Sequence, residues 1–329
     1  MTRTEPTSDE LTRFGIQPAD EGLHPFDPAV EWWNESWFWD WYDADGTNAG
    51  HCRIGIHPTQ QRAWIWLYVW RAGEWLAIEE TRLPLADLDQ PRLGYDRWGL
   101  RFGWDVARPL ARGHLHVEGY GRVLAGPRTG MVLPVTVDLD VTAIGPPHSM
   151  GKAVAEGHAS ERYPASRFEQ PITVAGTVAI AGDQRPLAGR GERDHSWGPR
   201  FWNLEWTFLA LNGERLCAQC VEARIPDVGR FAVGYLQRDA MATITEVRYD
   251  LAYRDDDVAR TVAGRVEATT EDGGRFAARI EPVTGTEIDI THCFAPPRRS
   301  VYRRTLVRVT PEGEAPLLGW LESNRFVGG

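Results

Sequence analysis

The run Arg193-Asp194-His195 places a cation, a carboxyl group and an imidazole side by side, shortly before Trp197. If this stretch is a strand, Asp194 faces one side, and Arg193, His195 and Trp197 face the other. In an apolar cavity, desolvation raises the pKa of a carboxyl group, so Asp194 could hold a proton and donate it to an alkene. His195 is the alternative acid or base, because imidazole titrates near neutral pH.

Both residues also have a structural interpretation. A buried aspartate is usually paired, so Asp194 could bind Arg193, Arg200 or a backbone amide and hold two halves of the chain together. His195 could be a hydrogen-bonded structural histidine. The motif is therefore a candidate catalytic site with a structural alternative.

Further carboxylates precede or lie within an aromatic strand. Glu31, in Glu31-Trp32-Trp33, could approach Asp194 and orient a water molecule as a base, or could form a salt bridge to an arginine. Asp40 lies opposite a row of tryptophans and needs a partner if it is buried.

Metal and cofactor motifs are weak. His114, His116 and Glu118 share a strand face and could bind a metal. The same pattern is equally typical of a strand that faces solvent. Cys217 and Cys220 lie three apart in an apolar strand and so face opposite sides. No Gly-rich phosphate loop, G-x-S-x-G or H-E-x-x-H motif is present. We expect no metal and no cofactor.

The tetrad Trp-Asn-x-x-Trp occurs twice, from Trp33 to Trp37 and from Trp202 to Trp206, and each copy leads to an Asp-Gly or Asn-Gly turn. This repeat predicts a duplicated fold. A further stripe on residues 62–70 either lines a cavity or fills a core. The side chains predicted to bind substrate are Trp33, Trp37, Trp39, Trp66, Tyr68, Trp197, Trp202, Trp206, Arg193 and Arg200.

Period-two patterns separated by turn signals predict an all-β protein of antiparallel strands. Short helices are expected near 8–14, 84–89 and 148–160. The Pro/Gly-rich stretch 182–191 suggests a boundary. We therefore expect a polar N-terminal tail over 1–24, a first β-domain over 25–181 and a second over 182–329.

The composition is that of a soluble globular chain. The 329 residues are 42% hydrophobic and 25% charged, with a net charge of −10. This charge argues against nucleic acid as a partner. No apolar run is long enough for a transmembrane helix, and no signal-peptide core is apparent. A cytoplasmic location and a hydrophobic small-molecule partner are expected, whereas the oligomeric state is open.

The blocks Glu31-Trp32-Trp33-Asn34 and Asp194-His195-Ser196-Trp197-Gly198 resemble the EWWY-like and DHEWG-like motifs of the carotenoid 1,2-hydratase and AttH-like superfamily. Asn34 and Ser196 depart from those motifs, which indicates a divergent branch. The resemblance implies two tandem lipocalin-like antiparallel β-barrels.

Three functions are compatible with these residues. The first is a cofactor-independent hydratase or cyclase that protonates an alkene of an isoprenoid- or steroid-like molecule, with Asp194 as acid and His195 or Glu31 assisting. The second is a non-catalytic carrier of lipids or steroids. The third is a cofactor-free pericyclase or isomerase. The ionisable cluster beside the tryptophans favours an enzyme.

Overall fold

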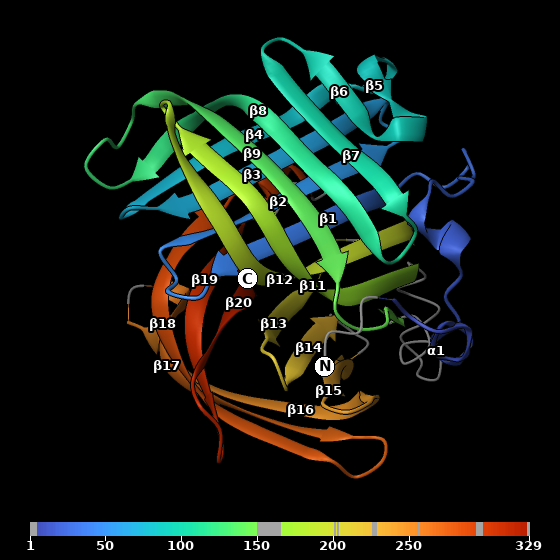
Figure 1. Ribbon diagram of the computed structural model, residues 1–329, viewed down its shortest axis with the longest axis vertical. Helices are drawn as coiled ribbons and strands as arrows, with labels where there is room; N and C mark the ends of the chain where they lie inside the picture. The colour runs from blue at the N-terminus through green and yellow to red at the C-terminus, as the bar shows by residue number, and fades with distance from the viewer. Residues whose placement is uncertain are drawn as a thin grey trace. The chain divides into compact units, whose positions relative to one another are not determined.

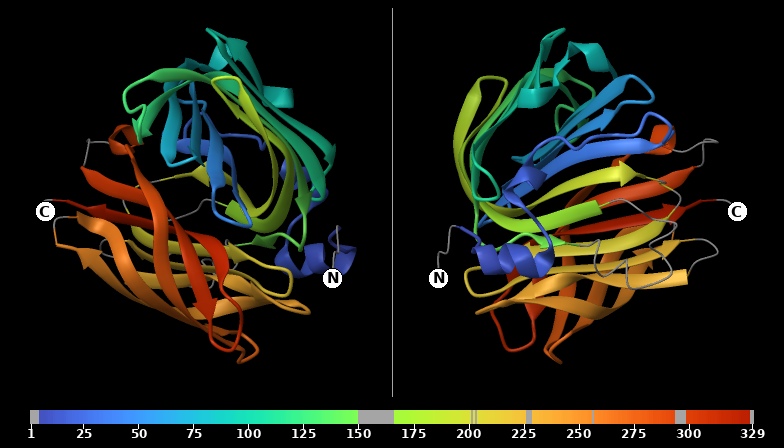
Figure 2. Two further views of the ribbon diagram at one scale, coloured as in Figure 1. Left: turned by 60° about the vertical axis from the view of Figure 1, so that its left-hand side comes forward. Right: turned by 90° about the vertical axis from the view of Figure 1, so that its right-hand side faces the viewer.

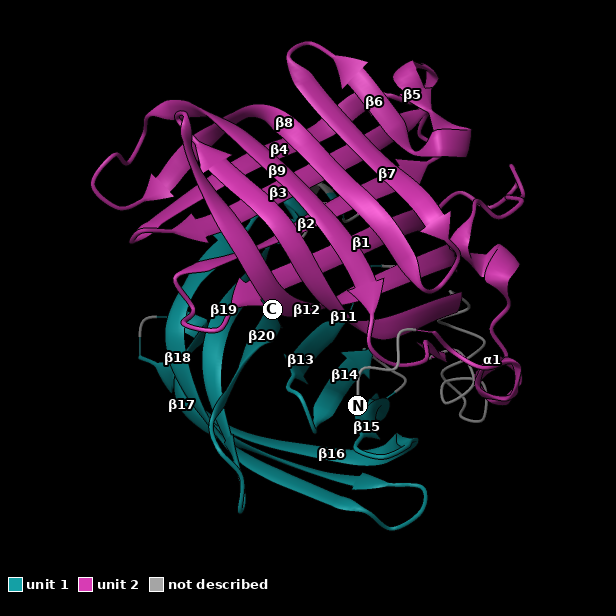
Figure 3. Cartoon of the chain, viewed as in Figure 1, with its two compact units in different colours: residues 1, 150–163, 201–329 teal, residues 2–149, 164–200 magenta. Residues whose placement is uncertain are grey.

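The computed structural model describes residues 5–149, 166–200, 202, 204–225, 229–255, 257–293 and 299–327. Strands dominate this part of the chain, and two compact units divide it near Arg200 (Figures 1 and 3). We call residues 2–149 and 164–200 the first barrel, and the unit that contains residues 201–329 the second barrel. The all-β tandem architecture predicted from the sequence is confirmed.

Eight strands of the first barrel pair antiparallel in a closed ring, each with the next and the last with the first. In ring order they are β1 (Trp33–Asp43), β2 (Asn48–His57), β3 (Arg62–Arg71), β4 (Glu74–Pro84), β8 (Arg112–Ala125), β9 (Val132–Ala143), β11 (Ser166–Ile180) and β12 (Asp183–Pro199). An up-and-down ring of this kind leaves no exposed sheet edge.

Shorter elements extend the first barrel. β5 (Leu88–Asp89), β6 (Gly94–Arg97) and β7 (Leu100–Arg108) form an excursion in which β7 pairs with β8. The 3-10 helices η2 (Leu85–Asp87) and η3 (Gln90–Arg92) flank β5, and β10 (His148–Ser149) pairs with β11. The helix predicted over 84–89 is thus one short 3-10 turn, and the segment predicted over 148–160 lies mostly outside the described residues.

Tryptophans fill the interior of the first barrel. Trp37, Trp39 and Trp41 belong to one apolar cluster that also takes residues from the facing strands, including Trp104 and Leu115. On β3, Ile65, Leu67 and Val69 join this cluster, so Trp64, Trp66 and Tyr68 lie on the outer face. The aromatic stripe of β3 is therefore not part of the barrel core, although its members are buried.

The second barrel closes in the same order along the chain (Figure 2). Its strands are β13 (Glu205–Asn212), β14 (Cys217–Ile225), β15 (Gly229–Gln237), β16 (Met241–Arg254), β17 (Asp257–Thr270), β18 (Arg275–Ile288), β19 (Ser300–Pro311) and β20 (Leu317–Phe326). The 3-10 helix η4 (Thr291–Cys293) precedes β19.

The two tetrads present their final tryptophans differently. Trp37 lies in the interior cluster of the first barrel, whereas Trp206 packs with Phe208 on the face of β13 opposite the core residues Leu209 and Leu211. A one-residue difference in register reverses the face of every strand side chain. The tetrads therefore lie at the first strand of each barrel, but their final tryptophans face opposite sides of the barrel wall. Asn203 of the second tetrad lies outside the described residues.

Residues before β1 belong to the first barrel rather than to a polar tail. The helix α1 (Ser8–Phe14) begins with a capping box between Thr7 and Glu10, and the 3-10 helix η1 (Pro18–Glu21) follows it. Phe14 is buried, and the carboxylate of Glu21 is buried against Arg193. The prediction of a tail over 1–24 missed this packing.

The stretch 182–191, predicted as a boundary, is part of a hairpin. Ile180 pairs with Asp183, and Ala181 and Gly182 turn the chain with φ of 53° and 83°. Two consecutive positive φ values are typical of the tight turns that join antiparallel strands. As a result β12, which carries Asp194 and His195, is the closing strand of the first barrel.

In the described part of the chain, no helix is both long enough and apolar enough to cross a membrane.

Candidate functional site on the two faces of β12

The closing strand β12 lies between β1 and β11 and sends adjacent side chains to opposite faces. His195 pairs in register with Trp37 of β1, and Asp194 pairs with Phe38. Because Trp37 points into the barrel, His195 faces the interior and Asp194 faces outward. The alternation predicted from the sequence is confirmed, so Asp194 and His195 belong to two different clusters.

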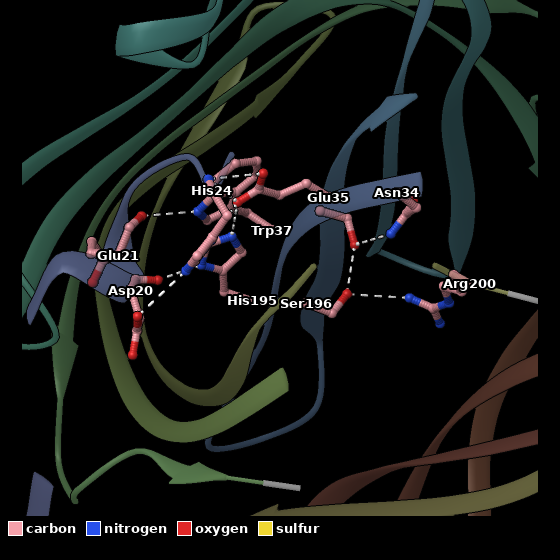
Figure 4. A network of polar contacts seen from close by, with 10 residues as sticks. Asp20, Glu21, His24, Asn34, Glu35, Trp37, His195, Ser196 and Arg200 are labelled. Carbon is pink, nitrogen blue, oxygen red and sulfur yellow. Dashed lines mark hydrogen bonds and ion pairs between the residues drawn. The ribbon is translucent and has the colours of Figure 1, made fainter. Parts of the chain in front are cut away.

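The inner cluster joins two histidines through one carboxylate (Figure 4). Glu35 Oε1 lies 2.8 Å from His24 Nδ1 and 3.0 Å from His195 Nε2. The backbone N–H of His24 also donates to this carboxylate, at 3.0 Å. On the far side of the ring, His195 Nδ1 donates to the carbonyl oxygen of Asp20 at 2.6 Å.

Aromatic rings hold the two imidazoles in place. His195 stacks on Trp37 with ring centroids 4.2 Å apart, and His24 stacks on Trp197 at 3.9 Å. Trp37 is itself fixed, because its indole N–H donates to the carbonyl oxygen of Glu21 at 3.2 Å. The rings of the inner cluster are thus pre-oriented by packing.

A buried ion pair lies on the same face. Arg193 donates to both carboxylate oxygens of Glu21, at 2.7 and 2.9 Å, and to Gln170 Oε1 at 2.8 Å. The guanidinium also lies over Phe168, 5.4 Å from its centroid. A two-pronged contact of this kind is among the stronger ion pairs in proteins. Arg193 thus ties the η1 segment to the barrel.

Neighbouring charged groups and hydrogen bonds lower the pKa values of the inner carboxyl groups, against the effect of burial. Burial alone would raise the pKa of Glu35, but hydrogen bonds from His195 and His24 lower it. Burial would also raise the pKa of Glu21, but the charge and the hydrogen bonds of Arg193 lower it overall. For His24, burial lowers the pKa, but the hydrogen bonds and charges of Glu35 and Asp20 raise it overall. These carboxylates are held as anions.

In the outer cluster, the pKa of a buried carboxyl group is raised rather than lowered. Glu169 of β11 pairs in register with Asp194, and Arg167 forms ion pairs with both, reaching Asp194 Oδ2 at 2.8 Å. Glu169 is only 1% exposed. Burial, together with the negative charges of Asp194 and Glu192, raises the pKa of Glu169 well above its usual value, against the opposing effect of Arg167. The outer cluster therefore contains a carboxyl group that favours its protonated form.

Rings and a further cation continue this row across the outer face. In register order, Asp194 is followed by Phe38 on β1, Arg53 on β2 and Trp66 on β3. The Arg53 guanidinium lies 5.1 Å from the Trp66 ring centroid. Directly opposed side chains on one sheet face contact each other. Glu169, whose pKa is raised, thus shares a face with aromatic rings.

The adjacent row is also polar and buried. Asp40 accepts a hydrogen bond from the backbone N–H of Glu192 at 2.7 Å. Beside it in register lie His51 and Tyr68, whose rings stack at 4.7 Å, and Tyr68 donates to Glu79. The bond to Glu192 favours a structural role for Asp40.

The structure distributes the predicted site residues over three places. Asp194, Trp66 and Tyr68 lie on the outer face of the first barrel, where Arg200 donates to Ser196 Oγ at 3.3 Å. His195, Arg193, Trp33, Trp37, Trp39 and Trp197 lie on the opposite, inner face of β1 and β12. Trp202 and Trp206 belong to the second barrel, where Trp206 donates to Glu322 at 3.1 Å.

Glu31 is exposed before β1 begins. Its carbonyl oxygen accepts hydrogen bonds from Thr59 Oγ1 and Gln60 Nε2, both at 2.6 Å. Among the described residues, no hydrogen bond or ion pair joins Glu31 to Asp194 or His195. The carboxylate that reaches His195 is Glu35, four positions later, on the same strand face as Trp37.

Sequence reasoning missed three residues: His24, Glu35 and Glu169. Glu35 could have been found from the alternation that points Trp37 and Trp39 inward, since it shares their parity. Glu169 depends on the pairing of β11 with β12, and His24 depends on the path of the segment before β1. Neither has a local sequence signal.

The weaker metal and thiol motifs form no comparable site. His114 and His116 lie on β8 and bond Asp140 and Asp138, each at 2.9 Å, on a partly exposed face. Cys217 and Cys220 are buried in β14 and form no disulfide.

A partly open cavity of about 1,040 Å³ lies at the surface of the second barrel. Its lining mixes charged residues such as Arg248, Arg275 and Glu246 with a few apolar ones such as Phe276. Binding sites for apolar ligands are lined mainly by hydrophobic side chains. This cavity does not have the lining predicted for a hydrophobic substrate.

Two tandem lipocalin-type barrels define the AttH-like class of folds. An AttH-like protein from Nitrosomonas europaea has this fold at 16% identity and a TM-score of 0.65, over 94% of this chain and 96% of that one. CghA, crystallised with Sch210972, aligns at 16% identity and a TM-score of 0.59, over 89% and 87%. Kievitone hydratase from Nectria haematococca aligns at 11% and 0.51, over 88% of each chain.

The chain belongs to the family described as "Domain of unknown function (DUF7064)", which matches residues 17–327. No curated protein matches the chain. At these identities the solved structures establish the fold, and the fold expected from the resemblance to the AttH-like superfamily is confirmed.

Proposed function

We propose that the protein is a hydratase or cyclase that protonates an alkene of a hydrophobic, isoprenoid- or steroid-like small molecule. The observation that supports it most is Glu169, a buried carboxyl group with a raised pKa beside Asp194 on the outer face of β11 and β12. A buried carboxyl group with a raised pKa beside a second carboxyl group is a usual arrangement for acid catalysis. Glu169 takes the acid role that the sequence suggested for Asp194.

The proposed reaction begins with transfer of the Glu169 proton to one alkene carbon, which leaves a cation on the other. The ring face of Phe38, which is paired in register with Asp194, stabilises that cation, and the Asp194 carboxylate adds a compensating charge. In hydration, a water oxygen then bonds to the cation and its proton returns to Glu169. In cyclisation, a second double bond attacks instead, and loss of a proton to Glu169 completes the reaction.

Arg167 contacts both carboxyl groups. Its Nη2 bonds Asp194 at 2.8 Å, while its Nε contacts Glu169. The Asp194 charge then raises the pKa of Glu169. The fold shared with kievitone hydratase supports this proposal, because it is a scaffold on which a protein named a hydratase is built.

A panel of isoprenoid and steroid alkenes, with mass spectrometry of the products, tests the proposal. Glu169→Gln keeps the shape and removes the acid, so we expect turnover to fall by about 10²- to 10⁴-fold. Asp194→Asn should also reduce turnover, because it removes a charge that raises the Glu169 pKa. Glu118→Gln, an exposed carboxylate on β8, is the matched control and should act as wild type.

Each outcome has a distinct meaning. A product 18 Da heavier than its substrate indicates hydration. Full turnover by Glu169→Gln contradicts the mechanism, and a product of unchanged mass that also survives this change indicates a pericyclase or isomerase. Ligand that is bound but never converted by the wild type indicates a carrier.

A further inference from the structure

Three atoms of the kind that bind transition metals converge inside the first barrel. His24 Nδ1, Glu35 Oε1 and His195 Nε2 all lie within 4.8 Å of one another (Figure 4). They come from three separate segments: the chain after η1, strand β1 and strand β12. Glu35 and His195 are buried, and the His24 side chain is 17% exposed.

The outer nitrogen atoms of both imidazoles have oxygen partners. His195 Nδ1 meets the Asp20 carbonyl oxygen at 2.6 Å, and His24 Nε2 meets Asp20 Oδ1 at 3.4 Å. Histidines that bind metals almost always donate their second N–H to a carbonyl or carboxylate. A single residue, Asp20, thus supplies both of the contacts that would orient two metal-binding rings.

The hydrogen-bond geometry at His195 is compatible with a cation beside the Glu35 carboxylate. The Asp20 carbonyl can only accept, so His195 Nδ1 carries a hydrogen, and in the neutral ring Nε2 is left with a lone pair. That lone pair faces Glu35 Oε1 at 3.0 Å, which is another acceptor. Two acceptors at this distance need a proton or a metal ion between them.

Ligand spacing favours a small divalent ion. Zn²⁺ binds histidine nitrogen and carboxylate oxygen at about 2.0–2.2 Å, which puts neighbouring ligands about 3.3 Å apart in a tetrahedral site. The distances from Glu35 Oε1 to the two nitrogens are 2.8 and 3.0 Å. Both distances are close to that spacing, and all three ligand atoms lie within 4.8 Å of one another.

We propose that His24, Glu35 and His195 form a binding site for a divalent transition metal of the Zn²⁺ type, with one coordination position left for solvent or another ligand. This site lies on the face of β12 opposite the proposed acid, and it departs from our expectation from the sequence that no metal is bound. A bound ion would join the segment before β1 to the two strands beneath it and stabilise the first barrel.

Metal binding to the chelator-treated full-length protein tests the proposal directly. We expect one Zn²⁺ per chain by equilibrium dialysis and elemental analysis, a higher melting temperature with Zn²⁺, and a visible absorption band with one equivalent of Co²⁺. His24→Ala should weaken Zn²⁺ binding at least 100-fold and abolish the melting shift. Asp20→Ala should weaken it about 10- to 100-fold, because it removes one orienting contact.

The partly exposed pair His114 and His116 provides the control, since it could bind Zn²⁺ adventitiously beside Asp138. The double variant His114→Ala/His116→Ala should keep the stoichiometry and the melting shift. Zn²⁺ binding that survives His24→Ala but not this double variant overturns the proposal. Absence of Zn²⁺ and Co²⁺ binding by the folded wild type also overturns it, whatever the variants do.

Discussion

The inner and outer faces of β12 differ in how their charges are balanced. On the inner face, Glu21 pairs with Arg193 and Glu35 lies between two histidines, so the pKa of each carboxyl is lowered. On the outer face, Glu169 and Asp194 share one arginine, and the pKa of Glu169 is raised. Adjacent residues of one strand thus belong to separate clusters. We therefore expect substitutions on the two faces to have separable effects.

The largest effect should follow from breaking the inner ion pair. Arg193→Ala leaves Glu21 buried without its cation, and loss of one partner of a buried pair costs about 3–5 kcal/mol. Urea denaturation measures this loss. Arg101→Ala, at an exposed arginine that pairs with Asp96 and Glu118, should cost under about 1 kcal/mol. Equal losses for the two variants would show that the inner pair contributes little.

The two faces should respond to pH in opposite directions. Because the folded pKa of Glu169 is raised above 4.5, its contribution to stability is complete below that pH and is lost as pH rises through the folded pKa. Because the folded pKa of Glu21 is lowered, its contribution is present above 4.5 and is lost as pH falls through the folded pKa. A tenfold difference in proton affinity between the folded and unfolded states corresponds to about 1.4 kcal/mol of stability.

Denaturation across a pH series measures both contributions. Relative to wild type, Glu169→Gln should gain stability as pH rises from 4.5, whereas Glu21→Gln should be least stable near neutral pH and approach wild type in acid. Parallel pH curves for wild type and both variants would refute the difference between the faces.

A smaller loss of stability is expected from a substitution at Tyr68, on strand β3 of the outer face. Tyr68→Phe removes the hydroxyl that donates to Glu79 and keeps the ring that stacks on His51. Loss of one such bond costs about 0.5–1.5 kcal/mol. Proposed turnover should change little, because strands β1 and β2 separate Tyr68 from Asp194. A large loss of activity in this variant would extend the catalytic cluster across the sheet.

Local alternation could be read from the sequence, and register could not. The opposite faces of Asp194 and His195 follow from the two-residue period of a strand, which needs no partner. The meeting of Glu169 with Asp194 needs the Ala181-Gly182 turn, and the surrounding glycines and proline suggested a boundary instead. The stretch 182–191 is instead part of a hairpin of the first barrel.

The choice of Glu31 illustrates a second limit. Its position before an aromatic strand suggested a catalytic carboxylate, but β1 begins at Trp33, and only residues within the strand take its alternation. Glu35 lies inside the strand and reaches His195. His24 lies outside any strand, so only the folded path from η1 to β1 brings it to Glu35.

The protonation state of Glu169 is the most direct test of the account. Carbon-13 NMR of protein labelled at the glutamate carboxyl carbons, recorded across a pH series, follows each glutamate without any substrate. We predict that one glutamate stays protonated at pH values well above the ordinary pKa of glutamate, and that its signal is missing in Glu169→Gln. Ionisation of every glutamate near its ordinary pKa would contradict the proposed acid.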